Sequence, residues 1–195
     1  DIADLSKEEI VGIVKEAGIV GMGGATFPNH VEISPPPDSK AEYVILNGAE
    51  CEPYLTADDR LIVENPEDVV YGIRALMKAL DVSKGFIGIE VNKPEAIANV
   101  TKAAEPYPEV EVVSLQVKYP EGAEKQLIYA CTGREVPSGA LPIAVGAVVD
   151  NVATAAAIAN AIKTGMPLVE RITTVTGPCI REPKNLVTKI GTKFS

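Results

Sequence analysis

The chain has 195 residues, 46% of them hydrophobic and 23% charged, which is enough to bury the core of one domain, or of one domain and part of another. Its 27 acidic and 18 basic residues give a net charge of −9, which argues against nucleic acid or an anionic membrane surface as the main partner. No apolar run approaches the roughly 20 residues that cross a bilayer, the charged start does not resemble a signal peptide, and there is no initiator methionine, so we expect a soluble, excised fragment.

The cysteine and histidine content predicts neither a metal site nor a catalytic side chain. Cys51, Cys131 and Cys179 lie far apart without a CxxC pair, as is typical of a protein from a reducing compartment. His30 is the only histidine, which excludes a multi-histidine metal site, and no Ser/His/Asp or Cys/His set can be assembled. Any redox chemistry therefore needs an outside group, as it does in flavin enzymes.

Local patterns predict the elements in chain order. A capping box at Ser6–Glu9 opens a helix that carries apolar residues at helical spacing up to Gly18. A glycine-rich segment, Gly21–Pro28, and a proline-rich loop follow. The next predicted strands are 43–46, 86–91 and 110–117, and the predicted helices between them are 66–80 and 94–105. This alternation predicts an α/β fold, a Rossmann-like layered domain with a mainly parallel sheet and flanking helices.

The last third of the chain continues the alternation of helices and strands, and its composition then changes. We expect a helix at 122–132 closed by Gly133, a strand at 144–149 and a helix at 151–163. From Thr173 the composition is typical of a small β-rich domain. The predicted organisation is an α/β domain at residues 1–168 and the start of a small β-rich domain at 169–195.

Gly21–Pro28 is the first candidate ligand segment. Its glycines let the backbone approach a ligand and present N–H groups to an anion or a ring, which Phe27 is able to cover. It is not a Rossmann fingerprint, because a helix precedes it and Thr26 stands at the third glycine's place. A tight surface loop explains the composition equally well.

Asn47–Pro53 directly follows the first strand, where ligands bind in open α/β sheets. The Asn47 amide suits the edge of an isoalloxazine ring, and Glu50 and Glu52 are able to accept from ribose hydroxyls or a carboxamide. The alternative is a turn with two solvated carboxylates.

Two further strand-to-helix junctions carry polar groups. Gly122–Lys125 offers free N–H groups and a helix dipole to a phosphate, with Lys125 as an added cation. Asn151–Thr154 offers an amide and a hydroxyl. In isolation each is better explained as an ordinary helix start, with Glu124 balancing the dipole in the first and Asn151 acting as a cap in the second.

Taken in this order, the four segments resemble the flavin-binding elements of the NADH-binding flavoprotein subunit of respiratory NADH:quinone oxidoreductase. The longer runs 44–58, 124–129 and 132–137 resemble the C subunit of the Rnf ion-translocating electron-transport complex, and the resemblance extends over about residues 5–162. It implies the SLBB-like identity of the β-rich start. It also implies an NADH-dependent flavin oxidoreductase in which hydride passes between NAD(H) and a noncovalent FMN, coupled in the full complex to ferredoxin and ion translocation.

The resemblance also implies site residues and partners. The FMN would be lined by Gly21, Gly23, Gly24, Asn47, Glu50, Gly122, Asn151 and Thr154, and the dinucleotide would be faced by Phe27, Glu52 and Glu124. Implied partners are the other subunits of an Rnf-type membrane complex, NADH and, indirectly, ferredoxin. The implied location is peripheral, on the cytoplasmic face of the cell membrane.

The chain departs from the family pattern at three points. Glu32 stands where the family usually has a lysine near the flavin phosphate, which predicts a loosely held phosphate, and Ala49 replaces an aspartate of the respiratory subunit, as expected of the Rnf branch. The cysteine clusters for 4Fe-4S centres are missing, as expected of a fragment without that C-terminal part. Two alternatives stay open: a cobalamin-reductase-like flavoprotein, and a non-catalytic assembly module without flavin.

Overall fold

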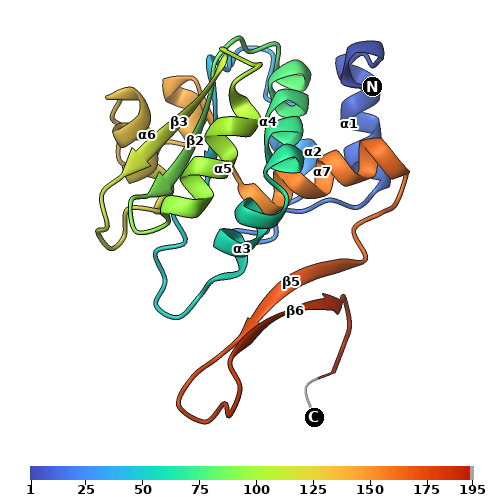
Figure 1. Cartoon of the computed structure of the whole chain (residues 1–195). Coiled ribbons are helices and arrows are strands. Elements are labelled where there is room, and N and C mark those ends of the chain that lie inside the picture. Colours follow the sequence, from blue (N-terminus) through green and yellow to red (C-terminus); the bar gives the residue numbers. More distant parts are fainter. Residues whose placement is uncertain (194–195) are drawn as a thin grey trace.

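The computed structural model describes residues 1–193, so residues 194 and 195, the last two of the predicted second domain, lie outside the described residues. Its centre is a four-stranded sheet, in which all neighbouring strands are parallel and the spatial order is β3-β2-β1-β4 (Figure 1). These strands are β1 (Tyr43–Asn47), β2 (Gly85–Glu90), β3 (Val110–Leu115) and β4 (Ala147–Asn151). The predicted α/β fold with a parallel sheet is confirmed.

Helices cover both faces of this sheet. One face packs against α1 (Lys7–Glu16), α3 (Ala57–Glu64), α4 (Pro66–Leu80), α5 (Pro94–Ala104) and α7 (Val152–Thr164), and the other packs against α6 (Glu124–Thr132). Successive side chains of a strand point to opposite faces. Accordingly, Val44 and Leu46 lie in the larger apolar core with the first group of helices, and Ile45 lies in the smaller core under α6.

The predicted side-chain caps of α1 and α7 are present, whereas Asn65 stands at the cap position of α4 without a capping hydrogen bond from its side chain. Ser6 accepts a hydrogen bond from the Glu9 amide and Glu9 accepts one from the Ser6 amide, which completes the capping box of α1. Asn65 precedes α4, with Pro66 in its first turn. The Asn151 side chain caps α7 by accepting from the Ala153 amide at 2.8 Å.

Several predicted boundaries are wrong. The strand predicted at 144–149 begins only at Ala147, because a short 3-10 helix occupies Pro142–Val145 and Gly146, with φ of 74°, separates the two. The helix predicted from Gly122 begins at Glu124. Two helices, α2 (Asn29–Glu32) and α3, lie in stretches of the sequence for which no element is predicted.

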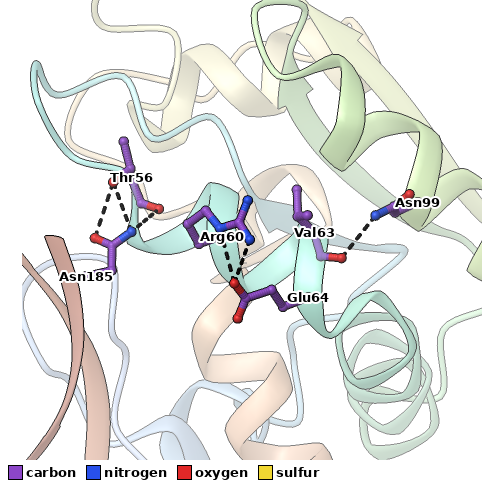
Figure 2. A network of polar contacts seen from close by, with 6 residues as sticks. All are labelled: Thr56, Arg60, Val63, Glu64, Asn99 and Asn185. Atoms are coloured by element: carbon purple, nitrogen blue, oxygen red, sulfur yellow. Dashed lines mark hydrogen bonds and ion pairs between the residues drawn. The ribbon is translucent and has the colours of Figure 1, made fainter.

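A two-stranded antiparallel hairpin of β5 (Glu170–Val175) and β6 (Lys184–Lys189) extends from the end of α7 below the sheet (Figure 1). It fits the expected start of a β-rich unit, although β5 begins before Thr173. Figure 2 shows how the hairpin meets α3: the Asn185 amide donates to the carbonyl and to the hydroxyl of Thr56, both at 3.0 Å. On its far side α3 meets α5, where Asn99 donates to the Val63 carbonyl at 3.0 Å.

Candidate functional site

The site lies at the point where the strand order reverses. From β1 the chain builds β2 and β3 on one side and then returns to place β4 on the other, so the carboxyl ends of β1 and β4 border the crevice. Such a switch point is the usual ligand site of an open α/β sheet. Asn47 and Asn151 are register partners at these two strand ends.

Two adjoining hollows open there. The large hollow has a volume of about 640 Å³ and is walled by the segment after β1, the segment before α6 and strand β5. The small hollow, of about 270 Å³, is walled by the glycine loop, α2 and the start of α6. The two hollows share four of their lining residues: Gly23, Asn47, Gly122 and Asn151. The large hollow alone has the size of a pocket for a cofactor-sized molecule.

The glycine loop is closed at its base and open at its tip. The Gly21 amide donates to the Phe27 carbonyl at 2.9 Å, and the Met22 amide donates to the Thr154 hydroxyl at 3.0 Å. The amides of residues 23–25 have no hydrogen-bond partner among residues 1–193, so they are available to a ligand. Gly23 permits the close approach to Asn151, since an added Cβ would lie 3.1 Å from the Asn151 Cβ.

Both asparagine side chains are fixed by structural hydrogen bonds. Asn47 donates to the Gly122 carbonyl at 2.7 Å and accepts from the Ala49 amide at 3.1 Å. Asn151, besides capping α7, donates to the Asp58 carboxylate at 2.7 Å. The amides are therefore held in one orientation at the junction of the hollows.

Glu50 and Glu52 line the large hollow in different ways. Glu50, at φ of 45°, accepts from the amides of Asp58 and Asp59 at 2.9 and 3.1 Å and so supports the first turn of α3. Burial raises the pKa of the Glu50 carboxyl, and burial likewise raises the pKa of Asp58. Glu52 is exposed and accepts from the Tyr119 hydroxyl at 3.0 Å.

Three carboxylates border the small hollow: Glu32, Glu124 and Asp150. Asp150 is buried at the end of β4, where burial and the nearby Glu32 raise its pKa to about 7. Burial also raises the pKa of Glu32 and of Glu124. Carboxyl groups with shifted pKa values that gather around one crevice are typical of functional sites.

The structure brings most of the predicted site residues together. Gly21, Gly24, Phe27 and Glu124 line the small hollow, in addition to the four residues that both hollows share. Thr154 is fully buried and holds the loop through Met22 instead of lining a hollow. Lys125 lies apart from both hollows, because its amine donates to the Pro137 carbonyl at 3.0 Å.

Three residues at or near the crevice were not among the site residues predicted from the sequence. Asp150 and Asn29 belong to the small-hollow network, and only the position of Asp150 beside Asn151 could have pointed to it. Arg171 lines the large hollow from β5 and donates to the Met22 carbonyl at 3.3 Å. No motif in the sequence marks this arginine.

Backbone strain is concentrated at the same place. Among the described residues, four other than glycine have positive φ, and three of these, Thr26, Glu50 and Tyr54, border the crevice or its rim. Such conformations cost on the order of 1–3 kcal/mol each and gather at ligand sites, since a surrounding structure must enforce them.

A parallel α/β sheet with a glycine loop and a cofactor-sized hollow at its switch point defines a nucleotide-cofactor-binding class of domain. The chain belongs to the Nuo51 FMN-binding domain family, whose family model matches residues 14–160.

Relatives of high sequence identity are components of ion-translocating redox complexes. The chain is 59% identical to the C subunit of the proton-translocating ferredoxin:NAD(+) oxidoreductase complex of Clostridium ljungdahlii, over 98% of this chain and 42% of that protein. It is 53% identical to the C subunit of the Na(+)-translocating complex of Acetobacterium woodii, over 99% of this chain and 44% of that protein. The chain thus spans less than half the length of these relatives, and its expected resemblance to the C subunit is confirmed.

A solved structure supports the fold. The NAD+-reducing [NiFe]-hydrogenase in its H2-reduced state superposes with a TM-score of 0.79 over 98% of this chain and 38% of that chain. At 22% sequence identity, this likeness shows the fold alone.

Proposed function

We propose that the chain is the FMN- and NAD(H)-binding portion of a subunit of a membrane-associated, ion-translocating ferredoxin:NAD+ oxidoreductase complex. The observation that carries this proposal is the pair Asn47 and Asn151, locked side by side over a hollow of about 640 Å³ beside a loop with free amides. Membership of an FMN-binding family and relatives that are subunits of such complexes support it.

The residues of the crevice fit the ring of a flavin. Its ring edge needs fixed donors and acceptors, and the backbone groups near Asn47 and Asn151 provide them in a hollow of suitable size. When bound, the flavin supplies the hydride and electron transfer that no side chain of this chain performs. The protein's part is to hold and orient the ring and the nicotinamide.

We assign the predicted residues to these roles. Gly21, Gly23, Gly24, Gly122 and Glu50 border the flavin through backbone or side chain, and Thr154 keeps the loop in place. Phe27, which is half-exposed, covers the dinucleotide side of the small hollow together with Glu124, and Glu52 faces the dinucleotide from the large hollow. Lys125 would need to leave Pro137 to reach a phosphate.

The relatives support a place for the chain in such a complex. We propose that it docks to other subunits on the cytoplasmic face of the membrane and exchanges electrons with ferredoxin through iron–sulfur centres carried by the remainder of a longer protein. Within residues 1–193, no helix combines the length and apolarity needed to span a bilayer.

Quenching of flavin fluorescence tests the proposal. Titrating purified chain into FMN and into riboflavin should give saturable quenching with at least one flavin, and anaerobic NADH should then bleach the bound flavin. Asn47→Ala should weaken binding roughly tenfold, since it removes a fixed amide, whereas Asn160→Ala, on the exposed side of α7, should leave it unchanged.

Other outcomes would point elsewhere. Absence of saturable binding for both flavins would contradict the proposal and favour a non-catalytic assembly module. Flavin reduction followed by electron transfer to a corrinoid, and not to ferredoxin when the full-length subunit is used, would favour a cobalamin-reductase-like flavoprotein.

A further inference from the structure

The small hollow presents opposite electrostatic features to the same space. Its glycine loop offers the free amides of residues 23–25, which favour an anion. Facing them are the carboxylates of Glu32, Glu124 and Asp150. A phosphate that reached the amides would therefore lie beside as many as three like charges.

Glu32 is held in this position. The Asn29 side-chain nitrogen donates to the Asp150 carboxylate at 2.6 Å and to the Glu32 carboxylate at 3.3 Å. Asn29 is fully buried, so one fixed amide group bridges the two acids. Its own side-chain carbonyl oxygen has no partner among residues 1–193. Glu32 would lose its hydrogen bond by turning away.

None of the three acids is paired directly with a cation of the described chain, although the charge of nearby Lys125 partly offsets the rise in the pKa of Glu124. None of the ion pairs among residues 1–193 includes Glu32, Glu124 or Asp150. The adjacent Lys125 amine is bound to the Pro137 carbonyl, and Arg171 lies in the large hollow. The small hollow is therefore a negatively charged end of the crevice.

The sizes of the hollows indicate which part of a flavin meets this end. The large hollow accommodates a tricyclic ring, whereas the small hollow, at about 270 Å³, suits the narrower ribityl chain. Because the hollows meet at Asn47 and Asn151, a ring in the first is able to extend its side chain into the second.

We propose that the small hollow selects a flavin whose side chain ends in a neutral hydroxyl, riboflavin, over FMN, and that Glu32 is the residue that sets this preference. The inference rests on the proposed flavin-binding function and departs from it in one respect, since the residues of the small hollow fit the phosphate of FMN less well than the neutral end of riboflavin. A terminal hydroxyl is able to accept from a loop amide and donate to a carboxylate at once. A phosphate dianion gains the first contact and is repelled by the second.

Parallel titrations of riboflavin and FMN at pH 8 and low salt test the selection. The unmodified chain should bind riboflavin roughly tenfold more tightly than FMN, since a like charge a few ångströms from a dianion costs about this factor in a partly solvated site. Glu32→Gln should raise FMN affinity and lower riboflavin affinity by a smaller factor, because the amide oxygen still accepts from the terminal hydroxyl, and Glu32→Lys should reverse the preference. Adding salt should bring the ratio of the two affinities closer to one in the unmodified chain, because salt screens the repulsion between the phosphate and the carboxylates.

Two further variants provide a second test of the charge effect and a control. Glu124→Gln, which breaks no hydrogen bond recorded for that side chain, should shift the ratio in the same direction, and Glu16→Gln, an exposed change on α1, should not shift it. Circular dichroism checks that each variant is folded.

Four results are decisive against the inference or its basis. Equal affinities for the two flavins in the unmodified chain, or a ratio unmoved by both Glu32→Gln and Glu124→Gln, would overturn the inference while leaving the flavin function intact. A selective loss of FMN binding in Arg171→Gln would also overturn it, by placing the phosphate in the large hollow. Failure to bind either flavin would instead remove the proposed function itself.

Discussion

Thr154 supports the glycine loop from behind, through the hydrogen bond that its hydroxyl accepts from the Met22 amide. Thr154→Val keeps the shape of this fully buried side chain but leaves the amide without a partner, which should lower the free energy of unfolding by about 1–3 kcal/mol. We also expect flavin affinity to fall several-fold, because the loop loses its anchor.

Thr154→Ser is the matched control for this prediction. It retains the hydroxyl, so it should preserve most of the flavin affinity even though it loses a methyl group. Equal flavin affinity in the Val and Ser variants, measured by fluorescence titration, would show that the hydrogen bond does not position the loop.

Asp150 gives the small hollow a pH dependence with a defined sign. Its folded-state pKa is raised from 3.8 to about 7, mainly by burial, so between about pH 4 and pH 7 the folded chain keeps a proton that the unfolded chain releases. The contribution of this group to stability therefore falls as pH rises through that window. Asp150→Asn, which cannot ionise, should be the more stable protein at pH 8, by about 2 kcal/mol, and lose this advantage toward pH 4.

Chemical denaturation at pH 8 and pH 4.5 measures this difference. Asp38→Asn, in the loop before β1, serves as a control for charge removal at an exposed site and should show little change at either pH. An Asp150→Asn advantage of the same size at both pH values would rule out ionisation as its cause.

Sequence reasoning identified the residues whose role follows from their place at the end of a strand. Asn47 and Asn151 stand at such ends, and a parallel sheet brings them together whatever the details of its helices. Arg171 could not be found in this way, because its approach depends on how the hairpin folds back toward the crevice. Lys125 shows the converse, since its position near a helix start predicts a ligand cation but its amine is bound elsewhere.

At the scale of elements, the contact between α4 and α7 depends on Gly72. A Cβ at this position would lie 2.1 Å from the Ala155 carbonyl oxygen, so the helices approach as closely as their backbones allow. Gly72→Ala should therefore destabilise the fold by about 1–3 kcal/mol, although alanine is the better helix former. Thermal or chemical unfolding measures this cost.

Gly12 provides the control on α1, since nothing lies within 4 Å of an added Cβ there. Gly12→Ala should stabilise the chain by about 0.5–1 kcal/mol through helix propensity alone. A stability gain in both variants would show that α4 and α7 are free to move apart.

The elements that were predicted well have strong local signals. Pro94 in the first turn and the apolar periodicity of α5 determine its bounds to within one residue of the prediction. By contrast, α3 is only eight residues long, has no side-chain cap from Thr56, and depends on Glu50, eight residues before Asp58, to accept from the amides of its first turn. A cap supplied from so far along the chain leaves no short pattern in the sequence.

At the scale of the whole molecule, the hairpin is attached to the α/β body by polar contacts. Asn185 makes three hydrogen bonds to Thr56: its amide nitrogen donates to the Thr56 carbonyl and hydroxyl, both at 3.0 Å, and its oxygen accepts from the Thr56 hydroxyl at 3.2 Å (Figure 2). Asn185→Ala should loosen the hairpin and speed limited proteolysis between β5 and β6 several-fold, while the melting temperature of the body changes by only a few degrees.

Asn160→Ala, on the exposed part of α7, should leave the cleavage rate unchanged. Unaltered cleavage in Asn185→Ala would mean that other contacts hold the hairpin, such as the one between Arg171 and the Met22 carbonyl.

One wall of the large hollow, Arg171–Thr174, belongs to this hairpin and not to the sheet that supplies the other walls. Occupancy of the crevice and docking of the hairpin are therefore thermodynamically linked: a ligand that touches β5 tightens docking, and docking raises ligand affinity by the same factor. A neighbouring protein that binds β5 and β6 in their docked position would therefore bind more tightly when the crevice is occupied. Its binding would in turn raise the affinity of the crevice for the flavin.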